Sequence, residues 1–212
     1  MSTRVRALGA VAAIVLLTGG CAAGTHPGAA AVVGKTEISV SDVDNTSRAV
    51  STALGQSFNT TAALNILVSN ALVSEIGQQK SITVTPAETA TAALSSVGED
   101  ETMYQKFQGS ADTRDFLNSV GTASVITVKL AGGTIKDLQN QAKLQQGVLA
   151  VREASKGIDV SVAPRFGKWS DGTLDNTISG SLSKESDQTA AKRKAAADAA
   201  QQSQGGQGQG QG

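Results

Sequence analysis

The sequence predicts a mainly α-helical protein with a small antiparallel β element, in which an N-terminal hairpin pairs with a strand from the C-terminal part of the chain. One long segment has strong helical periodicity, and four others carry helix-start signals. Short β-branched runs flank these helices on both sides. The expected β segments are 31–38 and 159–162, and the expected helices are 41–54, 59–80, 85–97, 110–130 and 134–156. We expect one folded domain over residues 31–178 of the 212.

The first twenty residues, Met1 to Gly20, form a signal segment. Arg4 and Arg6 give it a positive start, and its apolar stretch 7–17 is too short to remain as a membrane span. Removing it takes away two of the 18 basic side chains and none of the 18 acidic ones, which leaves a formal charge of 16 − 18 = −2. This balance gives no broad electrostatic attraction to nucleic acid.

The run Leu17-Thr18-Gly19-Gly20-Cys21 resembles the lipobox of bacterial lipoproteins, in which the cysteine becomes the lipidated first residue of the mature protein. Thr18 departs from the pattern, since leucine is usual there and the leucine of this chain lies one place earlier. The resemblance implies that acyl chains on Cys21 hold the protein at the extracytoplasmic face of the cell membrane, because two or more chains anchor a protein stably. The alternative is an ordinary secretory signal and a spare thiol at Cys21.

A flexible tether over residues 21–30 and a β-hairpin come next. The tether is rich in small residues and is interrupted by Pro27. It carries His26, the only histidine of the chain, which we expect to be inert there. The run 32–38, with a turn at Gly34-Lys35, then predicts two short antiparallel strands. Two strands are marginal on their own, so the hairpin needs a third.

Two helices begin with a hydroxyl residue three positions before an acid, which is the capping-box pattern. Ser41 and Asp44 place the first start, and this helix runs to about residue 54. Thr85 and Glu88 place the other start, with proline at the first helical position. The residues that this second helix is expected to bury are Ala87, Ala90, Leu94 and Val97.

The segment 59–80 has the strongest pattern in the chain. Asn59 is the expected N-cap, because its short polar side chain can accept from the free N–H groups of the first turn. Ile66 and Val73 lie off the main apolar stripe, so the helix is apolar over more than half of its circumference and should lie in the middle of the domain. The stripe itself consists of Leu64, Leu67, Val68, Ala71, Leu72 and Ile76.

The next part of the chain is less strongly patterned. The acidic run 98–101 predicts a solvated loop, since a cation site needs convergent oxygen atoms at alternate positions. A short apolar turn at 103–107 follows, and then a helix from Ser110 or Asp112 to about residue 130. The β-branched run 125–128 leaves a strand as the alternative for those four residues.

A last long helix and a third strand complete the domain. Thr134 and Asp137 form the expected cap of the helix, which runs to Lys156. Residues 159–162 then alternate polar and apolar side chains, and Pro164 stops the strand. We expect this strand to pair with the N-terminal hairpin and to bring the two ends of the domain together.

Residues 179–212 form a low-complexity tail that ends in Gln-Gly repeats, which bury too little apolar surface to fold. The basic run Lys192-Arg193-Lys194 is expected to be solvated there. Contact with anionic lipid or wall polymer is the alternative for this run.

The sequence offers no constellation for catalysis, so we expect that this protein is not an enzyme and uses no cofactor or metal. Nucleophile–histidine pairs and His/Cys metal sites need rigidly held residues, whereas the single histidine and the single cysteine both lie outside the expected domain. No phosphate-binding loop is present, and aromatic residues, at 3% of the chain, are too few for sugar- or base-stacking surfaces. Paired carboxylates remain open, because any two acids can converge in space. Cys21 is thus the one site residue that the sequence predicts.

The order of elements resembles the N-terminal chaperone domain of the SurA-type extracytoplasmic foldases, over about residues 31–183. The matching runs are VVGKTEI at 32–38, SDV at 41–43, LNILV at 64–68, KSITVTPAE at 80–88 and IDVSVAPRFGKW at 158–169. Ala163 stands before the proline of the last run, where the family often has asparagine. Similar lipid-anchored proteins occur in actinobacteria.

Full-length members of that family carry a parvulin prolyl-isomerase domain between the helical part and the closing segment. Here only residues 131–133 separate Leu130 from Thr134, which leaves no room for it, and no isomerase residue can be carried over. The resemblance therefore implies the non-catalytic half alone, which is transient binding of unfolded or exported polypeptides on apolar surface and strand edges. The alternative is a structural or interaction lipoprotein with one dedicated envelope partner. The sequence leaves the oligomeric state open.

Overall fold

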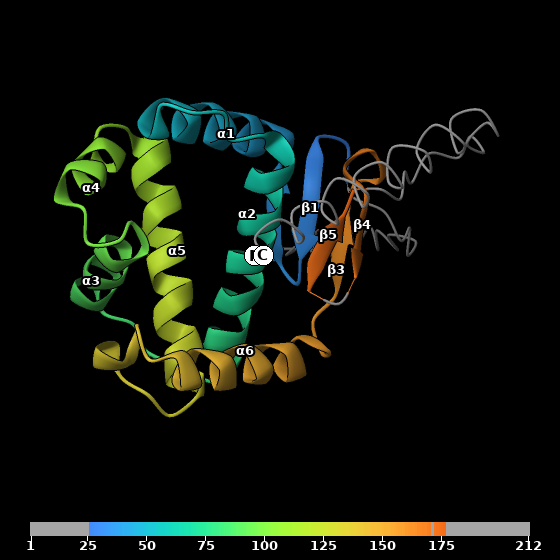
Figure 1. The fold of residues 1–212 in the computed structure, drawn as a ribbon. Helices are drawn as coiled ribbons and strands as arrows, with labels where there is room; N and C mark the ends of the chain where they lie inside the picture. The colour runs from blue at the N-terminus through green and yellow to red at the C-terminus, as the bar shows by residue number, and fades with distance from the viewer. Residues whose placement is uncertain (1–25, 171, 177–212) are drawn as a thin grey trace, which may run out of the picture.

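The computed structural model describes residues 26–170 and 172–176. It confirms the expected fold class, a mainly helical body with a small antiparallel sheet (Figure 1). The expected signal segment, Cys21 with most of the tether, and the tail at 179–212 lie outside the described residues. In chain order the elements are β1 (Ala29–Val33), β2 (Thr36–Ser39), α1 (Val40–Leu54), α2 (Thr60–Gln79), α3 (Pro86–Ser96), α4 (Glu101–Gln108), α5 (Ala111–Leu130), the 3-10 turn η1 (Ile135–Asp137), α6 (Gln141–Ser155), β3 (Val160–Val162), the 3-10 turn η2 (Pro164–Phe166), β4 (Lys168–Ser170) and β5 (Thr173–Asp175).

Three strands pair in the order β2-β1-β3, so the hairpin and the C-terminal strand meet as the sequence predicts. Both pairings are antiparallel, and Ala31 lies opposite Val162. The turn of the hairpin holds Gly34 at a φ of 54°, a conformation that glycine adopts without strain. Strand β1 begins at Ala29, two residues earlier than expected. Ala29 and Ala30 have the small side chains of a tether, but both are buried in the body.

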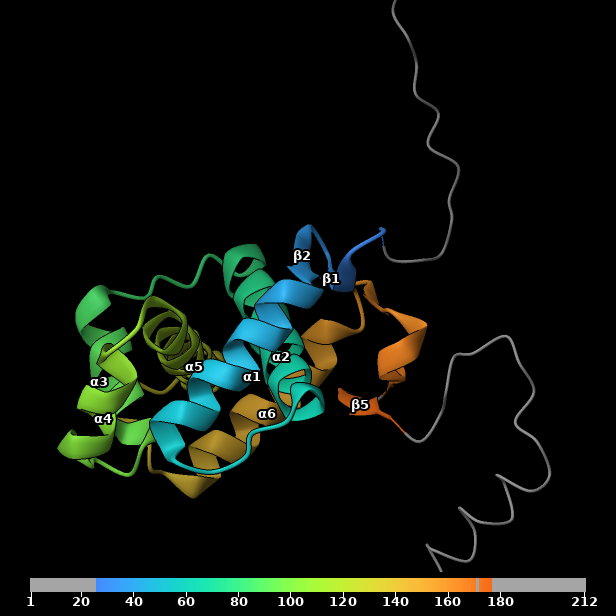
Figure 2. The ribbon, with the colours of Figure 1, turned by 90° about the horizontal axis from the view of Figure 1, so that it is seen from above.

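Helix α2 lies in the middle of the body, between the sheet and α5, as its wide apolar face predicts (Figures 1 and 2). Leu64 and Val68 of its main stripe are fully buried. The expected N-cap is confirmed, because Ala62 N donates to Asn59 Oδ1 at 2.8 Å. The apolar stripe thus places α2 at the centre, where α1, α5 and α6 pack against it, whereas α3 and α4 lie on the far side of α5 (Figure 1).

The expected cap of the first helix was wrong. The capping box uses Ser39 and Asp42, two positions before Ser41 and Asp44: Asp42 N donates to Ser39 Oγ at 3.0 Å, and Ser39 N donates to Asp42 Oδ2 at 2.9 Å. Ser39 is the last residue of β2, and its extended backbone (φ −79°, ψ 160°) is the geometry that an N-cap needs. Strand β2 therefore leads into α1 without a loop.

The predicted starts of α3 and α5 are confirmed. Thr85 and Glu88 form a complete capping box with Pro86 at the first turn, and Thr113 N donates to the Ser110 hydroxyl at 3.2 Å. Helix α5 continues through 125–128, so the alternative of a strand there is not realised. Its β-branched side chains at these positions pack inside the body, and this burial outweighs their weak helix propensity.

The last helix was predicted to be longer than it is. Thr134 and Asp137 do form a capping box, but it closes only the single turn η1. Helix α6 begins six residues later, where Asn140 Oδ1 accepts from Ala142 N at 3.1 Å and from Lys143 N at 3.2 Å. A second cap residue after a short interruption thus divides the segment into two elements.

The predicted buried face of α3 was wrong at its first two positions and correct in part at its last two, which are half-buried. Ala87 and Ala90 are exposed, whereas Ala92 and Ala93 are buried. Helix α3 packs against α5 where Gly121 leaves room for its backbone. A helix rich in alanine has no strong preference for one face, so the partner helix selects it.

Residues 101–108, expected as a loop and an apolar turn, form helix α4. Asp100 caps it, with Met103 N donating to Asp100 Oδ1 at 3.0 Å. One acid of the predicted loop thus starts a helix, and Phe107 at the other end is buried against α5.

A second hairpin, β4–β5, was not expected. Trp169 lies opposite Leu174 in it, and both side chains pack on the main core. Leu174 N donates to Asn65 Oδ1 at 3.1 Å, which ties the hairpin to α2. Among residues 26–170 and 172–176, no helix has the length and apolar content needed to span a bilayer.

Candidate functional site

Strand β2 has a free edge. It lies at one end of the order β2-β1-β3 and therefore pairs with β1 alone. In an antiparallel strand, alternate residues direct their N–H and C=O groups away from the paired neighbour. Apart from the Ser39 N–H, which donates to Asp42, the outer edge of β2 consequently offers backbone hydrogen-bonding groups to an extended chain placed beside it. Viewed from above, β2 is the strand on the α5 side of the sheet (Figure 2).

A hollow of about 310 Å³ lies beside β2. Helix α2 forms its floor, β2 one wall and α5 the other wall. Its lining side chains are small or medium-sized, and none of them carries a charge. They are Thr36, Ile38, Leu67, Asn70, Ala71, Ser74, Ser119, Thr122 and Ala123.

Hydrogen bonds hold the floor and the far wall of this hollow together. Asn70 Nδ2 on α2 donates to Ser119 Oγ on α5 at 2.9 Å, and Ser119 Oγ donates to Phe116 O at 2.7 Å. The hydroxyls of Thr122 and Thr89 lie 3.1 Å apart and join α5 to α3. These contacts, all within the body, fix the position of α5 relative to α2 and α3.

A second hollow, of about 240 Å³, adjoins the first, since Leu67 and Ser119 line both. It lies between α1 and α5. The carboxylates of Asp42, Asp112 and Asp115 border it, and no Lys or Arg is among its lining residues. We name the two hollows together the β2–α5 groove; the hollow beside β2 is its neutral end, and the hollow beside α1 is its acidic end.

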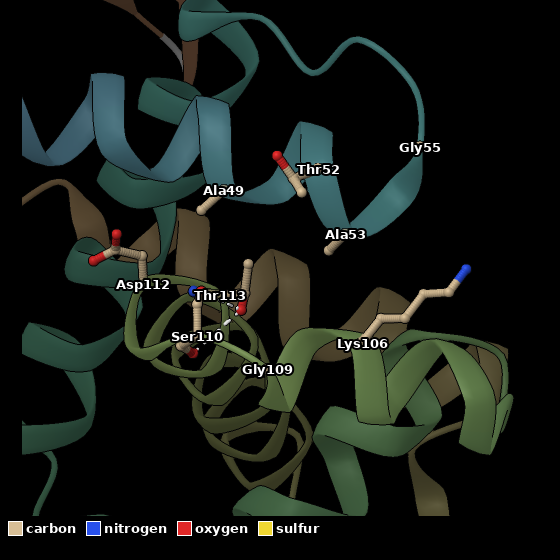
Figure 3. Close-up of a pocket in the computed structure, with 9 residues that line it drawn as sticks. All are labelled: Ala49, Thr52, Ala53, Gly55, Lys106, Gly109, Ser110, Asp112 and Thr113. Carbon is tan, nitrogen blue, oxygen red and sulfur yellow. Dashed lines mark hydrogen bonds between the residues drawn. The ribbon is translucent and has the colours of Figure 1, made fainter.

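A wider pocket of about 620 Å³ lies beyond the acidic end and shares Asp112 with it (Figure 3). The C-terminal part of α1 and the junction of α4 with α5 form its walls. Thr113 fixes that junction, because its buried hydroxyl donates to Phe107 O at 2.6 Å. Figure 3 shows Asp112 and Lys106 on opposite sides of the pocket, so they do not form an acid–base pair.

The shifted carboxyl groups of the described residues lie outside the groove. The hydrogen bond from Lys129 lowers the pKa of Glu88, helped by the backbone N–H of Thr85. The backbone N–H of Thr134 lowers the pKa of Asp137 in the same way. Both acids belong to capping boxes, and Glu88 also pairs with Lys129, so structural contacts account for both shifts.

Within residues 26–170 and 172–176, no group of three or more His, Cys, Asp or Glu side chains is placed to hold a metal ion. His26 Nδ1 lies 3.2 Å from Glu37 Oε2, and both side chains are largely exposed. Cys21, the site residue that the sequence predicts, lies outside the described residues, so its lipidation stays a prediction.

The groove itself was missed by sequence reasoning, which expected an apolar binding surface without naming its residues. A signal exists in α2, because Leu67, Asn70, Ala71 and Ser74 repeat at helical spacing. This second stripe shares Leu67 and Ala71 with the apolar stripe and adds only the polar positions Asn70 and Ser74, so it is a weaker signal than the apolar stripe itself.

A separate apolar surface lies on α6. Val148 and Leu149 are 59% and 66% exposed, and they are the exposed large hydrophobic side chains of the described residues. Neither residue lines the groove. Helix α6 runs along the opposite side of the body from α1 (Figure 1).

Comparisons of the chain with protein-family models, with curated proteins and with solved structures found no match.

Proposed function

We propose that this protein is a lipid-anchored extracytoplasmic binding module, and not an enzyme, that holds extended segments of unfolded or exported polypeptides in the β2–α5 groove. The observation that carries the proposal is the free edge of β2 beside an uncharged hollow whose floor and far wall are joined by hydrogen bonds within the body. A chain added to a strand edge gains backbone hydrogen bonds whatever its sequence, and its alternate side chains enter the neighbouring hollow. Such binding suits many different clients.

The resemblance to the chaperone domain of SurA-type foldases supports the same function. The closing strand β3 follows α6 directly, and residues 131–133 alone lie between α5 and Thr134, where a parvulin domain would have to be inserted. The proposed activity is therefore binding without prolyl isomerisation. Measurable isomerase activity of the purified protein would contradict it.

A test of the groove compares two tryptophan variants. Ser74→Trp fills the neutral end, whereas Ser96→Trp places the same bulk on the exposed surface of α3. We expect the unaltered protein to slow aggregation of several unrelated unfolded proteins at near-stoichiometric ratios, as measured by light scattering. Ser74→Trp should lose most of this protection and Ser96→Trp should keep it. A protein that protects none of the substrates would exclude the proposed function.

Crosslinking in the native membrane separates this proposal from a lipoprotein with one dedicated envelope partner. A photo-crosslinking amino acid at Thr36, which is exposed at the groove, should capture many exported proteins. The same amino acid at Val148 on α6 serves as the matched control. One recurring product at Thr36 would favour the dedicated partner.

The anchor is tested separately. Cys21→Ala removes the only thiol that could accept the lipid, so we expect the protein to move from the membrane fraction to the soluble extracytoplasmic fraction. Retention in the membrane fraction would count against lipidation of Cys21.

A further inference from the structure

The two ends of the β2–α5 groove differ in charge. The lining of the neutral end has no charged side chain, whereas Asp42, Asp112 and Asp115 border the acidic end. The two ends share Leu67 of α2 and Ser119 of α5, so they are adjacent and one bound segment can contact both. A ligand that occupies the whole groove therefore needs an uncharged part and a cationic part.

Two of the three carboxylates are available to a ligand. Asp42 Oδ2 already accepts from Ser39 N in the capping box of α1. Asp112 and Asp115 are exposed, and within the described part of the chain neither has an ion-pair partner. The nearest cation on α1, Arg48, is held by Asn45, with Nη2 donating to Oδ1 at 2.6 Å.

The spacing along α5 sets the spacing in the ligand. Ala123 at the neutral end and Asp115 at the acidic end are eight residues apart (123 − 115 = 8), which is about 12 Å at 1.5 Å per helical residue. An extended polypeptide covers that distance in about four residues at 3.3 Å each.

We propose that the groove selects polypeptide segments in which a Lys or Arg lies three or four residues from a small or medium-sized apolar side chain. The apolar side chain enters the neutral end between Ala71 and Ala123, and the cation lies at Asp112 and Asp115. The backbone of the segment runs beside β2. This inference rests on the proposed function, since it assumes that the occupant is an extended polypeptide.

The test measures binding of fluorescein-labelled nonapeptides to the mature chain carrying Cys21→Ala, by fluorescence anisotropy. The probes contain one Leu in a Ser/Gly/Thr background, with Lys, Gln or Glu four residues away; a fourth probe has Lys but no Leu. We expect the Leu–Lys probe to bind about five- to tenfold more tightly than the Leu–Glu probe. The difference in affinity between these two probes should shrink as the salt concentration is raised from about 20 to about 300 mM, because salt screens interactions between exposed charges.

Two double variants identify the carboxylates. Asp112→Asn/Asp115→Asn should abolish the preference for Lys while the Leu–Gln probe binds as before. The control Glu101→Gln/Glu153→Gln removes the same charge from helical positions outside the groove. Glu101, like Asp112, lies in the first turn of its helix. This control should keep the preference for the Lys probe. The urea midpoint of each variant shows that it is folded.

Each remaining outcome overturns the inference in a distinguishable way. Equal binding of all three Leu probes overturns the charge preference but leaves the proposed function standing. Failure of every probe to bind overturns both. If light scattering detects a dimer that Asp112→Asn/Asp115→Asn dissociates, the occupant is a second copy of this chain and the inference is wrong.

Discussion

At the scale of single residues, Gly121 determines how closely two helices approach. A Cβ at this position would lie 2.6 Å from Thr89 O and 2.8 Å from Ala93 N, both backbone atoms of α3. A backbone in a packed helix cannot move aside as a flexible side chain can. The absence of a side chain at Gly121 therefore sets the contact between α3 and α5.

We predict that Gly121→Ala lowers the free energy of unfolding by about 1–3 kcal/mol, the usual range for overpacking. Alanine in a helix interior gains about 1 kcal/mol over glycine, but the two short backbone contacts outweigh that gain. Urea unfolding followed by circular dichroism measures the change. Gly157→Ala is the control, because its Cβ would meet nothing closer than Ala154 O at 3.9 Å. An unchanged midpoint for Gly121→Ala would contradict the packing described.

The charge of Glu88 makes the contribution of the α3 cap to stability depend on pH. Lys129 Nζ lies 2.6 Å from Glu88 Oε1 and also donates to Thr83 O, so one ion pair joins α3, α5 and the loop before α3. The hydrogen bond from Lys129 is the main cause of the lowered pKa of Glu88. A carboxylate with a lowered pKa stabilises the folded state above its ordinary value of 4.5 and loses that contribution as the pH falls through its folded value.

We therefore predict that Glu88→Gln reduces stability at pH 7 and has less effect as the pH falls below about 4.5. The measurement is the difference in unfolding free energy between this variant and the unaltered protein from pH 7 to pH 3. Glu153→Gln is the control, because its ion pair with Lys156 is 68–74% exposed and contributes little. A constant difference across this range would mean that the charge of Glu88 is not what stabilises the cap.

Single residues also limit what the sequence can predict. Ser39 and Asp42 have the same spacing as Ser41 and Asp44, so the pattern alone cannot select the cap. The choice depends on which serine ends a strand, and that depends on pairing with residues elsewhere in the chain. Thr85 and Glu88 had no such competitor, and their prediction was confirmed.

At the scale of elements, Asn140 is the N-cap of α6, whereas Thr134 caps only the preceding turn η1. We predict that Asn140→Ala destabilises the protein by about 1 kcal/mol and speeds hydrogen exchange at the amides of Ala142 and Lys143, whose acceptor is lost. Thr134→Ala should affect only the turn η1 and leave those two amides protected. Exchange measured by NMR distinguishes the two caps. Faster exchange at Ala142 in Thr134→Ala would mean that the two segments form one cooperative helix.

Long elements with strong periodicity could be predicted, and so could the short strands β1, β2 and β3, whereas β4 and β5 could not. The stripe of α2 repeats over about three turns, so packing and sequence agree. Strands β4 and β5 each have one apolar side chain between two polar ones and no β-branched run, and they are held by contacts with α2 such as Leu174 N to Asn65 Oδ1. The groove was missed for a related reason: β2, α1, α2 and α5 each contribute a few ordinary side chains, and only the fold brings them together.

At the scale of the whole molecule, strands from near the two ends of the described chain pair with each other. Strand β1 pairs with β3, and Ala163 N donates to Ala30 O at 2.8 Å just beyond the paired residues. The sequence predicted this pairing because only one other β-branched, alternating run was available. Helices α1 to α6 thus lie, in the sequence, between two strands that pair with each other. The residues in contact are more than 120 positions apart (163 − 30 = 133).

We predict that a chain ending at Gly157 loses cooperative unfolding, since β1 then pairs with β2 alone and its buried residues lose the cover of β3. A chain ending at Asn176 retains β3 and the β4–β5 hairpin and should unfold at the same urea concentration as the full mature chain. Circular dichroism during urea titration measures both. An unchanged midpoint for the shorter chain would show that the helices are stable without the closing strand.

Under the proposed lipidation of Cys21, the early start of the folded body limits how far the body can move from the membrane. Ala29 N donates to His26 O at 2.9 Å, so the fixed part begins at His26, five positions after Cys21 (26 − 21 = 5). Five extended residues span at most about 18 Å at 3.6 Å each. Under that proposal the body would stay within a thin layer next to the bilayer. It would meet polypeptides as they emerge from the membrane, before they diffuse away.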